Sequence, residues 1–150
     1  MHTIENSQQT LTSLMQTIQD QAARSADYLA NTNNLQFSTE VTETGQNNST
    51  VIMEAHKGMP TTSLRVNDVA FDQIATKADL PTKTARRLRD VYPAVLDHAV
   101  REIWDKENEP RMIRSFMDSE SNSSGTARAF VSDRFKTFDN VHLLSAALPQ

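Results

Sequence analysis

The stretch Thr126–Asn140, TARAFVSDRFKTFDN, holds the signals that decide the fold of the C-terminal half of this 150-residue chain. Small and apolar residues alternate up to Val131, which is the period-two pattern of a β-strand. An Asp-Asn pair at 139–140 precedes an apolar segment in which Val141, Leu144 and Ala147 share one helical face. We therefore predict a strand, a basic corner and a capped final helix.

The same stretch supplies candidate binding residues. On the predicted strand, Arg128, Phe130 and Ser132 share one face, while Ala127, Ala129 and Val131 share the other. A sheet face that offers Arg and Phe can hold phosphates and stack exposed bases. The corner adds three further candidates: Arg134, Phe135 and Lys136. The alternative is that the phenylalanines belong to the core and the cations only border the sheet.

The acidic and amide residues of the corner also have two interpretations. Asp133, Asp139 and Asn140 can build the corner, by capping the helix and pairing with Arg128 or Arg134. They can instead act on a ligand. We treat them as structural residues of the corner.

Composition favours a single domain in a reducing compartment. The chain has no cysteine and three glycines, and it carries a net charge of -4 at pH 7. The acidic excess lies in residues 1–60, with two cations against six anions, whereas residues 61–150 hold thirteen of each. A charge-balanced segment can still present one basic face. No apolar run approaches the ~20 residues of a membrane helix, and the N-terminus lacks a signal peptide's pattern, so we expect a cytoplasmic protein.

The periodicities predict an α+β domain over residues 1–150, with an N-terminal helical segment at 1–34 and a core at 35–150. Strands are expected at Leu35–Val41, Thr50–His56, Ser63–Val66, Arg111–Asp118 and Thr126–Ser132. The first two form one predicted hairpin and the last two another. In Ser63–Val66, Leu64 and Val66 point inward and Arg65 outward. Three helices in series, punctuated by Pro81 and Pro93, lie between Asn67 and Glu109.

Residues 10–30 are predicted to form one amphipathic helix with a near-heptad apolar stripe. The stripe comprises Leu11, Met15, Ile18, Ala22, Ser25 and Leu29. It can dock on its own domain or pair with a second copy, which would make a homo-oligomer.

The segment Phe71–Val91 matches the cadence of a helix-turn-helix, with a turn at Leu80-Pro81. Its second helix carries Lys83 and three further candidate nucleic-acid-binding residues: Arg86, Arg87 and Arg89. In helix-turn-helix proteins such a helix contacts phosphates and base edges in the major groove. The alternative is an ordinary helical hairpin.

No constellation in the sequence supports an enzyme. Three dispersed glycines make no phosphate loop, Ser132-Asp133 has no positioned histidine, and only His98 and Glu102 have a spacing that suits metal ligation. Two ligands do not make a zinc site. We therefore expect no cofactor and no metal. A metal-dependent hydrolase or nuclease using Asp133 and Asp139 is a third hypothesis, which needs further ligands.

The run Ala127–Asn140, ARAFVSDRFKTFDN, resembles the signature of a phage and plasmid protein family, domain of unknown function 932. The resemblance covers roughly residues 60–150 and rests mainly on Ser132-Asp133-Arg134-Phe135 and Asp139-Asn140; Phe135 stands where the family usually has Tyr. Family members usually continue beyond this length, so the resemblance implies a short variant or a fragment. It also implies a mobile-element origin, an α+β fold and a location in the host bacterium, and it supplies no catalytic residues.

These observations lead to two hypotheses of different classes. The first is a non-enzymatic protein that associates with nucleic acid in replication or recombination, directed to single strands or the backbone rather than to a duplex sequence. The second is a protein-interaction module, such as a phage inhibitor of a host defence complex. The clustered cations and aromatics favour the first, and the acidic N-terminal residues favour the second.

Overall fold

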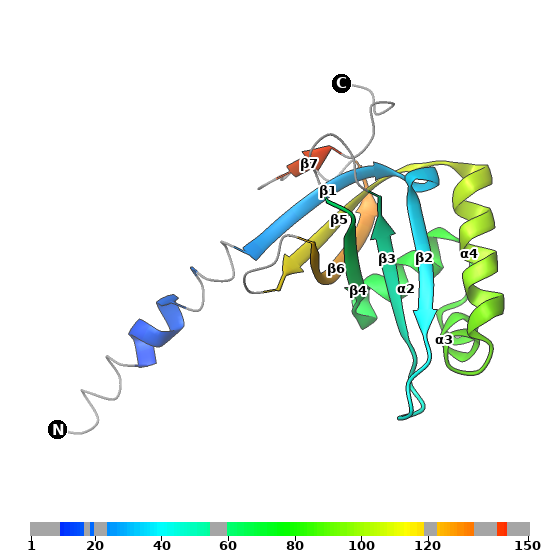
Figure 1. Cartoon of the computed structure of the whole chain (residues 1–150), viewed down its shortest axis with the longest axis horizontal. Coiled ribbons are helices and arrows are strands. Elements are labelled where there is room, and N and C mark those ends of the chain that lie inside the picture. The colour runs from blue at the N-terminus through cyan, green and yellow to red at the C-terminus, as the bar shows by residue number, and fades with distance from the viewer. Residues whose placement is uncertain are drawn as a thin grey trace.

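The computed structural model describes residues 10–16, 19, 24–54, 60–118 and 123–133, together with the backbone of 141–143. It confirms the α+β class, with one seven-stranded mixed sheet of order β2-β3-β4-β6-β5-β1-β7 (Figure 1). The strands are β1 Ser25–Asn31, β2 Leu35–Glu40, β3 Asn48–Met53, β4 Thr62–Val66, β5 Pro110–Met117, β6 Ser124–Ser132 and β7 Val141–Leu143. The helices are the 3-10 turn η1 Thr32–Asn34, then α2 Asp68–Lys77, α3 Thr82–Val91 and α4 Pro93–Glu107. Residues 10–16 are also helical.

The sheet joins two antiparallel units through one parallel pair of strands. Strands β2, β3 and β4 form the first unit, and β6, β5 and β1 form the second. The parallel pair β4·β6 connects them, and β7 pairs in parallel with β1 at the far edge. Both predicted hairpins form, and Gly45 at the first turn has a φ of 94°, a conformation that glycine tolerates well. Because the β4·β6 contact is distant in sequence, the strand patterns alone do not predict it.

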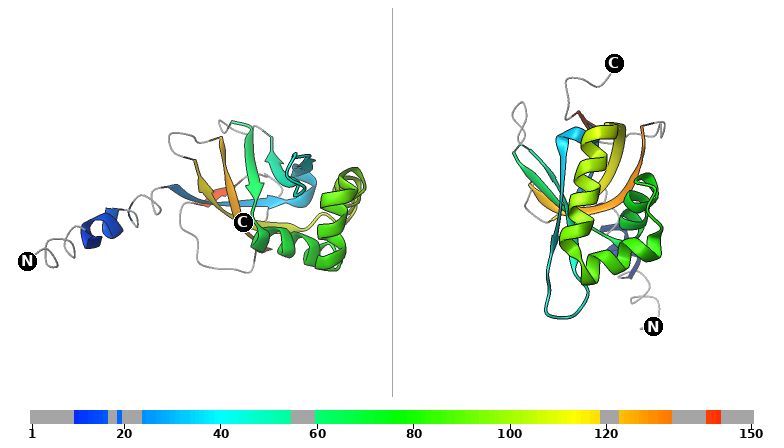
Figure 2. Two further views of the ribbon diagram at one scale, coloured as in Figure 1. Left: turned by 90° about the horizontal axis from the view of Figure 1, so that it is seen from below. Right: turned by 90° about the vertical axis from the view of Figure 1, so that its right-hand side faces the viewer.

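One face of this sheet, called here the inner face, carries the hydrophobic core. Its centre is an aromatic cluster in which Trp104 of α4 stacks on Phe130 at 5.5 Å and meets Phe37 edge-on at 5.7 Å. The inner face of the strands contributes Tyr28, Val51, Leu64, Ile113 and Ala127 to the same buried cluster. The sheet is strongly curved, and the three helices lie together on one side of it (Figure 2). Among the described residues, no helix is both long and apolar enough to cross a membrane.

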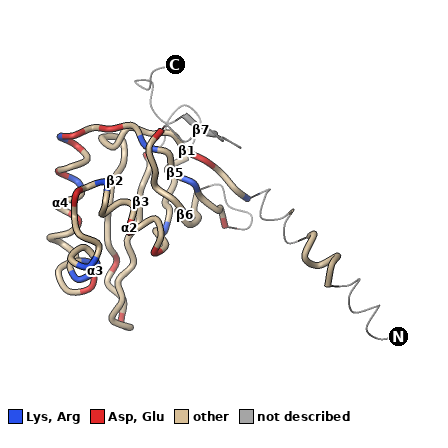
Figure 3. The backbone as a smooth tube through the Cα atoms, turned by 180° about the vertical axis from the view of Figure 1, so that it is seen from behind, with Lys and Arg blue, Asp and Glu red and all other residues tan. Residues whose placement is uncertain are grey.

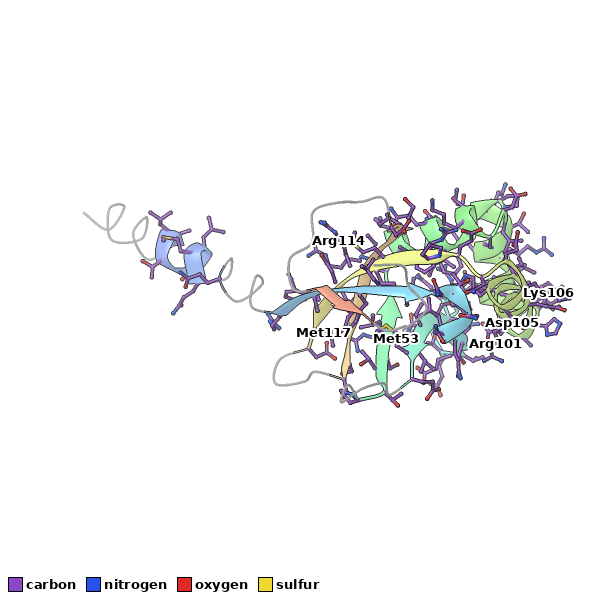
Figure 4. All side chains as sticks on the ribbon, turned by 90° about the horizontal axis from the view of Figure 1, so that it is seen from above. Met53, Arg101, Asp105, Lys106, Arg114 and Met117 are labelled. Atoms are coloured by element: carbon purple, nitrogen blue, oxygen red, sulfur yellow. The ribbon has the colours of Figure 1, made fainter. Side chains whose placement is uncertain are left out.

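Side chains of the helices form hydrogen bonds with backbone groups that two strands leave unpaired. Asn67, as predicted, caps α2 by accepting from the Ala70 amide at 2.9 Å. Where β4 ends, Gln73 of α2 accepts from the Phe130 amide of β6 at 2.7 Å. On α4, Asp97 accepts from the Thr39 amide at 2.9 Å, and Arg101, one turn later and labelled in Figure 4, donates to the Phe37 carbonyl at 2.7 Å. The helices therefore cover hydrogen-bonding groups that a sheet edge would otherwise expose.

The predicted helix over residues 10–30 is wrong at its C-terminal end. Ser25–Asn31 is strand β1, which pairs with β5 along its full length. The alternation of Ala26, Tyr28 and Ala30 on the inner face outweighs the helical spacing of Ser25 and Leu29, because β5 provides a pairing partner. In the remaining helical residues, Leu11, Leu14 and Met15 are more than half exposed. Ile18 and Ala22 lie outside the described residues, so pairing with a second copy stays a prediction.

The predicted final helix is also wrong where the structure describes it. Val141–Leu143 is a strand that pairs with Asp27–Leu29 of β1. The spacing of Val141 and Leu144 fits a helix, but a three-residue segment beside an available strand edge gains backbone hydrogen bonds by pairing. Residues 134–140, which include Asp139 and Asn140, and residues 144–150 lie outside the described part of the chain.

Candidate nucleic-acid interface

A β-bulge at Arg128 changes which residues of β6 point outward. Ala127 pairs with Ser115 and Ala129 pairs with Arg114, so Arg128 is an extra residue in β6. The extra residue reverses the alternation, and Ala127 and Phe130 therefore both face the core. The prediction that Arg128, Phe130 and Ser132 share one face is wrong for this reason. Bulges often redirect a side chain next to a functional site.

Phe130 does not offer its ring to a ligand. The residue is 1% exposed and stacks on Trp104 within the aromatic cluster, so a base could reach it only if the core opened. This finding corrects its assignment as a base-stacking residue. Arg128, in contrast, is exposed, and its guanidinium contacts no partner among the described residues.

The face opposite the core, called here the outer face, brings Arg65 and Arg114 together with Phe116. Arg65 of β4 lies opposite Thr126 of β6, and Thr126 lies opposite Phe116 of β5. Arg65, Thr126 and Phe116 therefore share this face. Arg114 lies two residues before Phe116 on the same face. Figure 4 shows Arg114 and the core residue Met117 on opposite sides of the sheet. The sequence predicts that Arg65 points outward, but it does not single out Arg114 or Phe116 as candidate binding residues.

Arg65 and Phe116 are held in place by neighbouring side chains. The Arg65 guanidinium donates to both oxygens of Asp118, at 2.8 and 3.3 Å, and Ser124 donates to the same carboxylate at 2.9 Å. The hydrogen bond from Arg65, followed by that from Ser124, lowers the pKa of Asp118 below its usual value. The Arg24 guanidinium lies 4.5 Å from the centre of the Phe116 ring, a cation–π contact. These contacts orient a cationic and aromatic surface before any ligand arrives.

The three arginines selected on α3 differ in their environments. Arg86 forms a two-pronged ion pair with Asp72 of α2, at 2.6 and 3.1 Å. Arg89 is 7% exposed, lies 4.6 Å from the centre of the Phe71 ring and pairs with Asp90 at 2.9 Å, which lowers the pKa of Asp90. Its assignment as a nucleic-acid contact is therefore corrected, because its guanidinium stabilises the packing of α2 and α3. Arg87 is exposed on α3.

The structure does not bring the selected cations into one track. Figure 3 shows the basic positions of α3, in blue, at one end of the molecule, apart from β5 and β6. Arg134, Phe135 and Lys136 lie outside the described residues, so their assignment stays a prediction. Asp133, which the structure does describe, is exposed.

His98 and Glu102, whose spacing would suit metal ligation, lie in contact on the surface of α4. The His98 Nε2 lies 3.2 Å from the Glu102 carboxylate, and the Lys106 ammonium lies 3.0 Å from it on the other side. Lys106, and then His98, lower the pKa of Glu102. In the part of the chain that the structure describes, no group of three or more His, Asp or Glu side chains is placed to share a metal ion.

Comparisons of the chain with protein-family models, with curated proteins and with solved structures found no match. The resemblance of residues 60–150 to domain of unknown function 932 therefore stays a prediction.

Proposed function

We propose that the protein binds single-stranded nucleic acid on the outer face of β4, β6 and β5 and catalyses no reaction on it. The observation that carries this proposal is that three adjacent strands each provide one outward arginine, Arg65, Arg128 and Arg114, around the ring of Phe116. The long guanidinium side chains can contact successive phosphates, and the Phe116 ring can stack on a base that takes the place of the Arg24 guanidinium. The net charge of -4 does not oppose this, because contacts depend on the local face.

The geometry favours a single strand over a duplex. Neighbouring strands of a sheet lie ~4.8 Å apart. Arg65 and Arg114 are two strands apart and offset by two residues along the strand, so their Cα atoms are separated by roughly 12 Å. An aromatic ring on a sheet face can stack only on a base that has left its helical stack. In helix α3, the candidate for reading a duplex, Arg89 is buried and packs on the Phe71 ring. The resemblance to domain of unknown function 932 is the reason to assign this binding to phage or plasmid replication or recombination.

Fluorescence anisotropy with a labelled oligonucleotide of about 12 nucleotides, at about 50 mM salt, tests this proposal. We expect the single strand to bind more tightly than a duplex of the same sequence. Arg128→Ala should weaken binding, because it removes an exposed cation without breaking a described contact. Lys106→Ala removes another exposed cation, on α4, and serves as the control, which should bind as the wild type does.

Two results would contradict the proposal. One is the absence of binding to either oligonucleotide at low salt. The other is a loss of affinity in Arg87→Ala, on α3, that equals or exceeds the loss in Arg128→Ala, which would move the interface to the helical end. Phe116→Ala should weaken single-strand binding by roughly tenfold, since base stacking on an aromatic ring contributes ~1–3 kcal/mol.

We propose a protein-interaction module as the second candidate function. Val91, Tyr92 and Val95 at the junction of α3 and α4 are each about half exposed, with Tyr92 at 49%. Neighbouring exposed apolar side chains are typical of protein-binding surfaces. A host protein that co-purifies after nuclease treatment, and is lost with Tyr92→Ser while Lys106→Ala retains it, would favour this function. Retention of that protein by Tyr92→Ser would exclude this surface.

A further inference from the structure

Most of the large apolar side chains that the described residues expose lie in two places. The first is the helix at residues 10–16, called here the terminal helix, which exposes Leu11, Leu14 and Met15. Spacings of three and four place these three side chains on one face of the helix. The second place, called here the apolar end, lies where α3 meets α4 and comprises Val41, Val91, Tyr92 and Val95. Grouped apolar side chains of this kind are typical of binding surfaces.

The apolar end is one surface because hydrogen bonds hold its two segments together. The Asn47 side chain, after the turn between β2 and β3, donates to the Arg89 carbonyl of α3 at 2.8 Å. The Thr39 amide of β2 donates to the Asp97 carboxylate of α4 at 2.9 Å. Val41 lies between these two anchored points of the chain. It is therefore held at the same end of the molecule as the junction of α3 and α4.

The charges next to these two surfaces are complementary. Lys83, Arg87 and Val91 follow one another at intervals of four residues on α3, so they share one helical face. Lys83 and Arg87 are exposed, which gives the apolar end a basic border. Residues 1–23, which contain the terminal helix, carry Glu5 and Asp20 but no Lys or Arg. Opposite charges around an apolar contact favour this pairing over others.

We propose that the terminal helix of one copy docks, through Leu11, Leu14 and Met15, on the apolar end of a second copy. Figure 1 shows the start of β1, which follows the terminal helix in the chain, and the junction of α3 and α4 at opposite ends of the molecule. A reciprocal exchange, in which each helix docks on the other copy, closes a two-fold dimer and covers both surfaces. This inference is independent of nucleic-acid binding on the sheet. It names a second copy, instead of a host protein, as the partner of the apolar end.

Light scattering coupled to size-exclusion chromatography of the full chain, over a concentration series, tests this inference. We expect a dimer that dissociates on dilution. The helix variant Leu11→Ser, Leu14→Ser and the end variant Val91→Ser, Tyr92→Ser should each raise the dimer dissociation constant by at least about tenfold, because each loses apolar contacts. Val69→Ser is the matched control: Val69 on α2 is 58% exposed, against 57% for Val91, and its loss should leave the constant unchanged. The fluorescence of Trp104 checks that each variant is folded.

A mixture of the two double variants distinguishes docking on a second copy from docking within one chain. The end variant keeps an intact helix and the helix variant keeps an intact end, so the mixture should form dimers at concentrations where neither variant does alone. The β2 edge has no part in this dimer, so uncovering that edge would produce larger species.

Three results would overturn the inference. One is a wild-type protein that stays monomeric at high concentration, and another is a mixture that associates no better than its components. The third is a dimer that the helix variant abolishes and the end variant preserves, because the terminal helices would then pair with each other. Unchanged oligonucleotide binding in the same samples would leave the proposed function intact.

Discussion

Replacing Phe130 by Ala should cost the protein much of its stability and should not act as a specific binding defect. Phe130 is 1% exposed and stacks on Trp104 at 5.5 Å. Truncation of a buried Phe costs ~3–5 kcal/mol, and loss of an aromatic pair adds ~0.5–1.5 kcal/mol where the pair is well formed. We expect a decrease in the free energy of unfolding of about 4 kcal/mol. That is a large fraction of the ~5–15 kcal/mol typical of a domain.

Urea unfolding followed by the fluorescence of Trp104, the one tryptophan of the chain, measures this cost. With a denaturant slope of ~1–3 kcal/mol per molar urea, the midpoint should fall by about 2 M. Phe116→Ala is the matched control, since its ring lies on the outer face, and it should lose no more than about 1.5 kcal/mol, including its cation–π contact with Arg24. A smaller loss for Phe130→Ala than for Phe116→Ala would refute the placement of Phe130 in the core.

Three further predictions concern the edges and the charges of the sheet. Because Arg65 lowers the pKa of Asp118, this ion pair stabilises the fold above the usual carboxyl pKa of 3.8. In urea unfolding, the stability difference between the wild type and Asp118→Asn should therefore disappear as the pH falls from about 5 to about 2. The double variant Asp97→Ala, Arg101→Ala uncovers the β2 edge, so size-exclusion chromatography should detect concentration-dependent association. Gly125→Ala should destabilise the fold by at least about 1 kcal/mol, since its Cβ would lie 2.6 Å from a backbone oxygen of β5.

Each of these predictions has an outcome that would contradict it. A stability difference for Asp118→Asn that stays constant across the acid range would mean that the ion pair does not govern its pKa. A monomeric double variant at high concentration would show that α4 is not needed to protect the edge. A Gly125→Ala protein with wild-type stability would mean that β5 and β6 approach each other less closely than described.

The sequence predicts the elements whose signals are local. The three central helices are set by Asn67, Pro81 and Pro93, and the two hairpins by alternating apolar residues and their turns. The sequence does not predict β1 or β7, because each becomes a strand only by pairing with a segment about 80 or more residues away.

The candidate site was only partly predictable for a related reason. Arg128, selected as a binding residue on the predicted strand, is exposed, but its position in a bulge depends on the register between β5 and β6. That register places Phe130 in the core and leaves Phe116 outside. The residue pattern of β6 alone does not contain this register, because the register depends on β5. The burial of Arg89 likewise depends on the packing of α3 against Phe71.

The most direct test of the central claim is an NMR titration of the isotopically labelled protein with a single-stranded oligonucleotide at low salt. We predict that the largest amide shift changes fall in Thr62–Val66, Pro110–Met117 and Ser124–Ser132, and that added salt reverses them. Changes confined to Thr82–Val91, or no changes at low salt, would contradict binding on the outer face of the sheet.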